Sequence, residues 1–263
     1  MQIEDAVVVV AHPDDEILWF SSILERCKSA IVCFGPSATS VESYDQGRAA
    51  VIENYPLDKV RFLKLTQSDA NGEGHWKRPS DAGFRLRRPN VSYEANRVKL
   101  VSALASLLEG ERFVFTHNPW GEYGHEEHVQ VFDVLAALKA QLGYELRVSG
   151  YVGKRSLKTM LKSSCTLDGP PLIMKTDQKL AGELRQLYLQ NNCWTWREDN
   201  NWPDFEVFYR FNDLAGRCST TRETTEPLNF ISYELDQSLP RRVAGKLLPP
   251  AVKARLKRSL NLN

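Results

Sequence analysis

The stretch VVVVAHPDDE, residues 7–16, decides the fold. Its four valines are β-branched and uninterrupted, which predicts a strand buried on both faces of a parallel sheet. The polar run from His12 to Glu16 follows at the carboxyl end of that strand, where open α/β sheets bind their ligands. Imidazole and carboxylate side chains at this edge are ligands suited to zinc. Pro13 and the acids after it also suit a helix start, so both interpretations stay open at this point.

A second polar segment, THNPWGEYGHEEH, spans residues 116–128 and follows a predicted buried strand at residues 113–115. His125 and His128 are three residues apart and can share one face at the first turn of a helix. Three of the five histidines of the chain lie in this segment, which favours a metal site over simple capping of the helix. The spacing is not His-Glu-x-x-His, so the common zinc-protease helix is excluded.

Strand and helix patterns alternate over the first 150 residues. Strands are predicted at residues 6–11, 30–34, 60–65, 112–116 and 145–150, and helices at 17–28, 42–55, 92–108 and 126–142. This alternation predicts an α/β fold, Rossmann-like, with a mostly parallel sheet and helices on both faces. We expect a single domain over residues 1–263, with its core at about 5–150 and a small carboxy-terminal elaboration and basic tail at 151–263.

The composition is that of an ordinary soluble globule. Hydrophobic residues make up 42% of the chain and the net charge is +1, which gives no reason to expect a nucleic-acid partner. No apolar run reaches eighteen residues, so no transmembrane segment is predicted. The first segment lies too near the start of the chain for a removed signal peptide. The five cysteines are scattered, which favours reduced thiols and a cytoplasmic protein.

Together, the two segments resemble the PIG-L/LmbE-like family of zinc-dependent N-deacetylases, the GlcNAc-phosphatidylinositol de-N-acetylase superfamily. Residues 11–16 match its first motif, Ala-His-Pro-Asp-Asp-Glu, at every position. Residues 124–128 resemble its second motif, which is usually Gly-His-Pro-Asp-His. Here Glu126 replaces the proline and Glu127 replaces the aspartate. The resemblance covers roughly residues 5–150 in organisation.

The resemblance implies a metal site that both segments form. His12, Asp15 and His128 would hold Zn²⁺ or another divalent metal and leave one position open for water, as catalytic zinc sites do. Such an ion polarises an amide carbonyl and lowers the pKa of bound water from about 16 towards 7.

The resemblance also implies which groups move protons. Asp14 would be the general base, and His125 would be the general acid or the group that stabilises the oxyanion and protonates the leaving amine. Glu127 corresponds to an aspartate that orients His125, and is one methylene longer. Tyr123 is a candidate donor to the oxyanion, or else a loop aromatic that packs on Trp120.

The sequence identifies candidate substrate-binding residues less clearly than candidate metal ligands. Arg48 lies near the place where the family carries a substrate-binding arginine, and Trp120 belongs to the second segment. Residues 66–91 form a long loop whose arginines could meet a phosphate or an acidic sugar, or form a solvated face. Residues 191–202 combine Trp with Asn, which suits contact with a carbohydrate or packing of the elaboration onto the sheet.

These observations predict a metal-dependent hydrolase that removes the N-acetyl group from an N-acetylated amino sugar or glycoconjugate. Hydrolysis of another small amide or N-acyl conjugate is one alternative, and a non-catalytic sugar-binding protein on the same fold is another. Asp14 beside Asp15 favours an enzyme, because a base has no purpose without a water to activate. The expected partner is a small N-acetylated sugar. The basic tail at residues 240–263 suits peripheral contact with an anionic membrane, or packing on the domain.

Overall fold

The computed structural model describes residues 1–37, 40–76, 84–196, 200–212 and 227–231. The residues up to Ile231 form one compact unit. The basic tail lies beyond it, outside the described residues, and its membrane contact stays a prediction. No helix of the described residues is long and apolar enough to cross a membrane.

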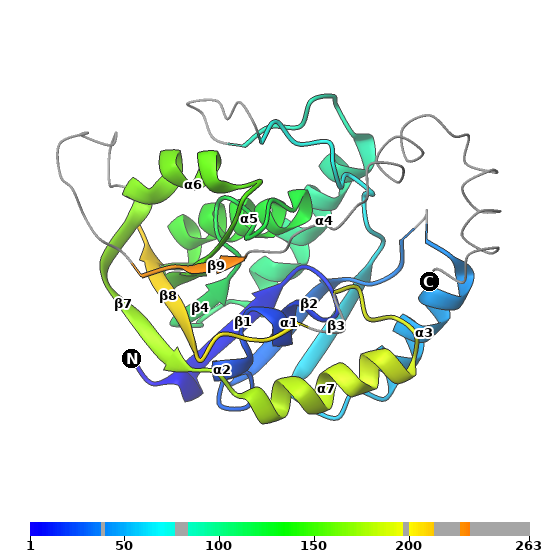
Figure 1. Ribbon diagram of the computed structural model, residues 1–263. Coiled ribbons are helices and arrows are strands. Elements are labelled where there is room, and N and C mark those ends of the chain that lie inside the picture. Colours follow the sequence, from blue (N-terminus) through cyan, green and yellow to red (C-terminus); the bar gives the residue numbers. More distant parts are fainter. Residues whose placement is uncertain (38–39, 77–83, 197–199, 213–226, 232–263) are drawn as a thin grey trace. The chain divides into compact units, whose positions relative to one another are not determined.

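Strands and helices alternate through the described chain, as the sequence pattern predicts (Figure 1). The strands are β1 (Ala6–Val10), β2 (Ser29–Phe34), β3 (Val60–Leu65), β4 (Phe113–Thr116), β5 (Glu145–Ser149), β6 (Tyr151–Gly153), β7 (Leu167–Lys175), β8 (Phe205–Phe211) and β9 (Asn229–Ile231). The helices are α1 (Asp15–Leu18), α2 (Ser21–Leu24), α3 (Glu42–Glu53), α4 (Val91–Leu107), α5 (Glu126–Leu142), α6 (Leu157–Ser163) and α7 (Gln178–Gln190), with 3₁₀ turns η1 (Ile3–Asp5) and η2 (Ser164–Thr166).

Seven of the strands form one sheet in the order β3-β2-β1-β4-β5-β8-β7, and β6 pairs with β9. The five strands from β1 to β5 pair in parallel, and β8 and β7 add two antiparallel strands. The predicted mostly parallel α/β sheet is therefore confirmed. The chain runs outward from β1 to β3 and returns on the other side of β1 with β4. The carboxyl ends of β1 and β4 thus flank the switch point where such sheets bind ligands.

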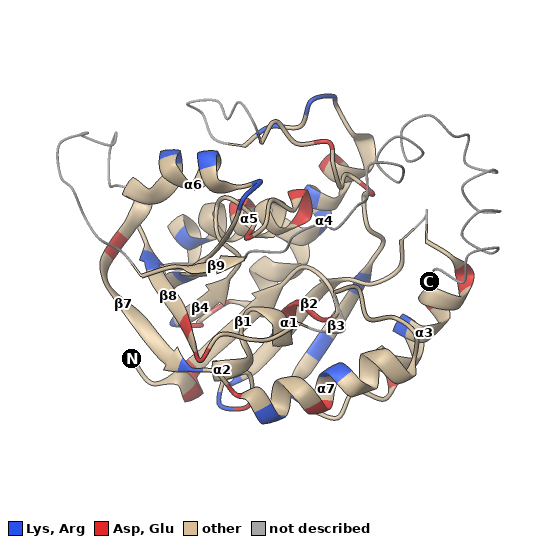
Figure 2. Ribbon diagram, viewed as in Figure 1, with Lys and Arg blue, Asp and Glu red and all other residues tan. Residues whose placement is uncertain are grey.

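Helices cover both faces of the sheet (Figure 1). Val8 and Val10 of β1 pack in the core that contains residues of α1, α2 and α7, whereas Val7 and Val9 pack in the core beneath α4 and α5. Successive side chains of a strand point to opposite faces, so a strand between two helix layers needs apolar residues at every position. Basic and acidic residues are interspersed over the described elements (Figure 2).

The single helix predicted at residues 17–28 is wrong, because the chain forms two short helices, α1 and α2, in its place. Buried Glu206 of β8 accepts both the backbone N–H and the hydroxyl of Ser21 and of Ser22, at 2.6–3.1 Å. These bonds satisfy backbone donors at the start of α2, where a negative charge also favours the helix dipole. A new helix therefore begins there.

Residues after 150, expected to form a small elaboration, contribute to the central sheet itself. They supply β7 and β8 at one edge of the sheet, and α7 packs against α1 and α3. The α3–α7 contact depends on Gly47 of α3. A Cβ atom built there would lie 1.9 Å from the carbonyl oxygen of Asn191, just after α7.

We therefore expect Gly47→Ala to lower the free energy of unfolding by about 1–3 kcal/mol, the cost of overpacking a tight contact. Urea denaturation measures this change. Gly182→Ala in α7 is the matched control, because a Cβ atom there meets nothing within 4 Å. The control should raise stability by roughly 0.5–1 kcal/mol, the usual effect of removing glycine from a helix. Equal effects of the two substitutions would contradict the assigned contact.

Candidate active site

Asp14 adopts an unusual backbone conformation at the carboxyl end of β1. Its backbone φ of 97° is positive, a conformation that residues other than glycine rarely adopt. Its backbone N–H donates to Glu16 Oε2 at 2.9 Å and to the Tyr188 hydroxyl at 3.0 Å. Glu16 Oε1 in turn accepts from the hydroxyls of Tyr55, at 2.8 Å, and Tyr188, at 2.6 Å. This buried network holds a strained residue in place, as functional sites often do.

The Asp14 carboxyl group is itself buried. Burial, and then the charge of the neighbouring Asp15, raise the pKa of Asp14 to about 7. A general base works best when its pKa lies near the operating pH, so this carboxylate suits proton abstraction.

Buried donor atoms from both segments converge beside Asp14. Asp15 Oδ2 lies 3.2 Å from His12 Nδ1 and 3.3 Å from His128 Nε2. Ligand atoms around a tetrahedral zinc ion lie about 3.4 Å apart when the bonds are about 2.05 Å long. Both distances match that spacing.

The donor groups differ in part from the predicted set of His12, Asp15 and His128. Among the described residues, two groups have ligand atoms within 4.8 Å of one another: His12 with His125 and His128, and Asp15 with His117 and His128. Each group contains two of the predicted ligands, and His128 is common to both. The predicted set of three stays a prediction.

His128 offers the clearest fit to a metal ion. Its Nδ1 pairs with Glu122 Oε2 at 2.7 Å, while its buried Nε2 has no hydrogen-bond partner. A buried polar atom without a partner is costly, and a metal ion would satisfy it. A carboxylate on the far nitrogen of a ligating histidine fixes its tautomer and raises its basicity. The residues present therefore fit a divalent ion such as zinc.

Glu122 is the functional residue that the sequence analysis missed. Besides His128, its carboxylate pairs with His117 Nδ1 at 3.0 Å and accepts from the backbone N–H of Asn118 at 3.1 Å. His117 Nε2 accepts from the Ala11 N–H at 2.8 Å, so this ring is already used on both sides. An acid close in sequence to a candidate ligand histidine is the signal that could have identified Glu122.

We expect Glu122→Gln to weaken zinc binding by about 10- to 100-fold, the usual effect of losing a carboxylate behind a ligating histidine. Competition with a chromophoric chelator measures the affinity. Glu183→Gln on the exposed face of α7 is the matched control and should bind zinc like the parent chain. If Glu122→Gln binds zinc as tightly as the parent chain does, the Glu122 carboxylate does not support a ligating His128.

His125 caps the start of α5 and faces the donor groups. Its ring lies 4.6 Å from the His12 ring and 4.6 Å from the His128 ring, between centroids. Its Nδ1 accepts the backbone N–H of Glu127 at 3.2 Å, which leaves the ring proton on Nε2. Burial, and then the charges of His12 and His128, lower the pKa of His125 well below its ordinary value. With Nδ1 used as an acceptor, the ring presents its Nε2–H as a donor.

The contacts of Glu127 differ from the predicted role of orienting His125 through its carboxylate. Glu127 Oε2 lies 2.7 Å from His12 Nε2, and Oε1 accepts from the N–H and hydroxyl of Ser68, at 2.5 and 2.7 Å. Only the Glu127 backbone reaches the His125 ring. The Glu127 side chain is one methylene longer than that of the aspartate in the usual motif. Its carboxylate contacts His12 and therefore orients His12 rather than His125.

Glu126, the other departure from the usual motif, is fully buried. Its Oε1 accepts from the N–H groups of Gly72 and Gly74, from Trp76 Nε1 and from Arg155, at 2.7–3.1 Å. This carboxylate therefore fixes part of the 66–91 loop beside the second segment.

The two predicted substrate residues, Arg48 and Trp120, have different surroundings. Arg48 is buried, donates to the Gly35 carbonyl at 2.8 Å, and its charge acts on Asp14. Its buried Nε has no hydrogen-bond partner. Trp120, by contrast, is fully buried, donates to the Tyr151 carbonyl and packs on Met160. The prediction that Trp120 binds substrate is wrong, because a core position leaves no face for a ligand.

Tyr123 is half-buried beside the histidines. Its ring lies 5.8 Å from the His125 ring and 5.5 Å from the His128 ring, and it contacts Trp19 and Trp196. Its ring thus contacts Trp19 and Trp196, whereas the predicted packing partner was Trp120, which lies in a different apolar cluster. The role of Tyr123 as a donor to the oxyanion stays a prediction.

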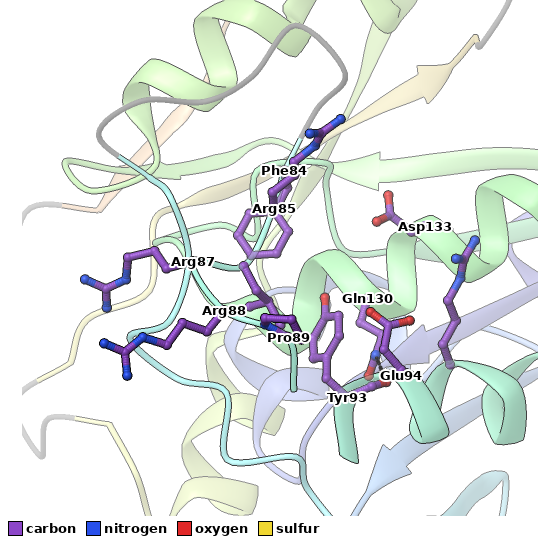
Figure 3. Close-up of a pocket in the computed structure, with 11 residues that line it drawn as sticks. Phe84, Arg85, Arg87, Arg88, Pro89, Tyr93, Glu94, Gln130 and Asp133 are labelled. Atoms are coloured by element: carbon purple, nitrogen blue, oxygen red, sulfur yellow. Dashed lines mark hydrogen bonds between the residues drawn. The ribbon is translucent and has the colours of Figure 1, made fainter. Parts of the chain in front are cut away.

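The arginines of the 66–91 loop line a different cavity, of about 580 Å³, between that loop, α4 and α5 (Figure 3). Tyr93 and Gln130 form its inner wall, and Glu94 and Asp133 add negative charge. Arg87 and Arg88 extend away from Tyr93 in Figure 3. The guanidinium groups thus do not converge on one anion.

Comparison with known proteins relates the chain to deacetylases. It is 27% identical over 147 residues to 1D-myo-inositol 2-acetamido-2-deoxy-alpha-D-glucopyranoside deacetylase of Mycobacterium sp. (strain KMS), covering 49% of this chain and 48% of that protein. It is 26% identical over 168 residues to the enzyme of the same name from Mycobacterium leprae (strain Br4923), covering 56% and 54%. The chain spans about half the length of the curated relatives it matches. No family model matches it.

Two solved structures share the fold. The deacetylase of teicoplanin biosynthesis in complex with teicoplanin superposes with a TM-score of 0.50 at 9% identity, over 79% of this chain and 97% of that one. A deacetylase–bog complex from the same pathway gives 0.51 at 12% identity, over 79% and 99%. At these identities the likeness shows the fold. With the sequence relatives, it confirms that this chain resembles the PIG-L/LmbE-like family of deacetylases, to which its two motifs point.

Proposed function

We propose that this chain is a zinc-dependent N-deacetylase that hydrolyses the acetamide of an N-acetylated amino sugar. One observation carries the proposal: buried Asp14 lies beside a cluster in which Asp15 Oδ2 is 3.3 Å from His128 Nε2, a buried nitrogen that makes no hydrogen bond. A base next to such a pair of ligand atoms is the minimum that metal-assisted amide hydrolysis needs. The names of the sequence relatives support an acetamido sugar as the substrate class.

The metal would be held by His12, Asp15 and His128. When bound, a divalent ion polarises the acetamide carbonyl and lowers the pKa of the attacking water. Asp14 takes a proton from that water as its oxygen forms a bond to the carbonyl carbon. The Asp14 carboxyl group is buried, so its proton is retained in the site rather than lost to solvent.

His125 serves the other side of the carbonyl group. Its Nε2–H donates to the oxygen as negative charge develops there, which is the role of an oxyanion hole. Glu127 keeps its backbone N–H on His125 Nδ1, so that the tautomer is preserved. The Tyr123 hydroxyl is a second candidate donor to the same oxygen. The C–N bond then breaks, and the amine nitrogen takes the proton that Asp14 received from the attacking water. Acetate and a free amino sugar leave.

The experiment is to incubate the zinc-loaded chain with a panel of N-acetyl sugars and measure released acetate. The panel contains free, glycosidic, nucleotide-linked, lipid-linked and polymeric N-acetylglucosamine, together with small N-acyl conjugates that carry no sugar. Release of acetate from at least one compound, with equal formation of free amine, supports the proposal. Release only from other N-acyl conjugates would favour the more general amidohydrolase. Sugar binding without acetate release would identify a binding protein. A cytoplasmic location and a membrane-bound tail remain predictions.

A further inference from the structure

The segment that follows α7 lies against the first motif, although about 180 residues separate them in sequence. Its start is fixed by Cys193, whose backbone N–H donates to the Tyr188 carbonyl at 3.0 Å. Its end is fixed by Trp202, whose Nε1 donates to the Ile17 carbonyl at 2.7 Å. In Figure 1 the described parts of this segment, residues 191–196 and 200–202, run back in yellow from the end of α7 past α1. Both anchors bring residues 193–196 to the carboxyl end of β1.

Thr195 meets the base directly. Its hydroxyl donates a hydrogen bond to Asp14 Oδ2. The other described hydrogen bonds of Asp14 involve its backbone, so Thr195 is the described partner that fixes the carboxylate itself. The hydroxyl thus occupies one of the two oxygens of the Asp14 carboxylate.

Trp196 extends the site outward from the histidines. Its ring lies 4.9 Å from the Tyr123 ring at an interplanar angle of 62°, and 5.5 Å from the Trp19 ring at 88°. Tyr123 in turn contacts the rings of His125 and His128. Edge-to-face packing of this kind holds each ring rigidly. Trp196 is only partly buried, so part of this aromatic wall is exposed.

We propose that Thr195 is a positioning residue for Asp14 and that Trp196 is the stacking face for the sugar ring of the substrate. Both assignments rest on the proposed function. A sugar presents apolar C–H groups on one ring face, which pack on a flat aromatic ring, and the wall leads from Trp196 through Tyr123 to His125 and His128. The segment after α7 would therefore couple substrate binding to the orientation of Asp14.

The test of Thr195 compares Thr195→Val with Thr195→Ser. Valine keeps the shape and removes the donor. It should lower kcat roughly 10- to 100-fold, the value of a hydrogen bond to a charged group, with KM and zinc content unchanged. Serine keeps the hydroxyl and should rescue kcat. Crystal structures of both variants should show the Asp14 carboxylate in place with serine and turned with valine. A parent-like kcat for valine, or equal loss in both variants, would overturn this assignment.

The test of Trp196 measures the Kd of N-acetylglucosamine by calorimetry and the KM of acetate release. Trp196→Ala should raise both roughly 5- to 10-fold with a smaller change in kcat, because aromatic packing contributes to binding rather than to proton transfer. Trp196→Phe should retain most of the affinity. A parent-like Kd for Trp196→Ala would overturn the stacking assignment, and so would a parent chain that binds no N-acetylglucosamine.

The two proposals fail in different ways. A parent chain that binds the sugar and releases no acetate contradicts deacetylation alone. In that case the Kd of Trp196→Ala still decides the stacking assignment, and the crystal structures of the Thr195 variants still decide the orientation of Asp14.

Discussion

Asp14→Asn is expected to keep its zinc and to lose turnover by about 10²- to 10⁴-fold, the range for removal of an acid–base group. The amide has nearly the same shape as the carboxylate but cannot accept the proton of the attacking water. Acetate release measures kcat, and elemental analysis measures zinc per chain.

Asp58→Asn is the matched control for this substitution. Asp58 is exposed and precedes β3, at the amino end of the sheet, opposite to the site. The control should match the parent chain in both zinc content and kcat. If Asp14→Asn releases acetate at the parent rate, Asp14 only caps α1 and another group is the base.

His128→Ala is expected to lose the bound metal and, with it, detectable acetate release. The loss of affinity should exceed the roughly 100-fold upper range seen when only a supporting carboxylate is removed. His128 belongs to both donor groups found among the described residues, and its buried Nε2 makes no hydrogen bond, so its loss removes one ligand from each group. Zinc per chain is measured after dialysis against a low zinc concentration.

His125→Ala provides the comparison, because His125 belongs to one donor group only. It should retain zinc and lose turnover. If His125→Ala empties the site and His128→Ala does not, the two histidines have exchanged roles. Retention of zinc by both variants would place the metal on the group of Asp15 and His117.

Local pattern was enough for the core elements. The helix predicted at residues 126–142 is α5, and the strand predicted at residues 30–34 is β2 with one more residue. The neighbours of each residue in sequence decide these elements, because apolar periodicity and turn residues act over a few positions. The same holds for the two polar segments, whose place at strand ends follows from the strands before them.

The sequence pattern did not predict the contacts between residues that lie far apart in the chain. Glu206 divides one expected helix into two, and Trp120 is used in the core instead of at the substrate. Glu127 binds His12 rather than orienting His125, because the fold brings their side chains within 2.7 Å. None of these pairings has a local signature.

The sequence by itself determined the mostly parallel sheet and the residue types of the candidate metal site. These depend on strand periodicity and on motifs of a few residues each. Only the tertiary structure decided which residues support the site: Glu122 behind His128, and Thr195 on Asp14. The physical reason is that a buried carboxylate or imidazole must find a partner wherever packing places one, and packing is set by the whole chain.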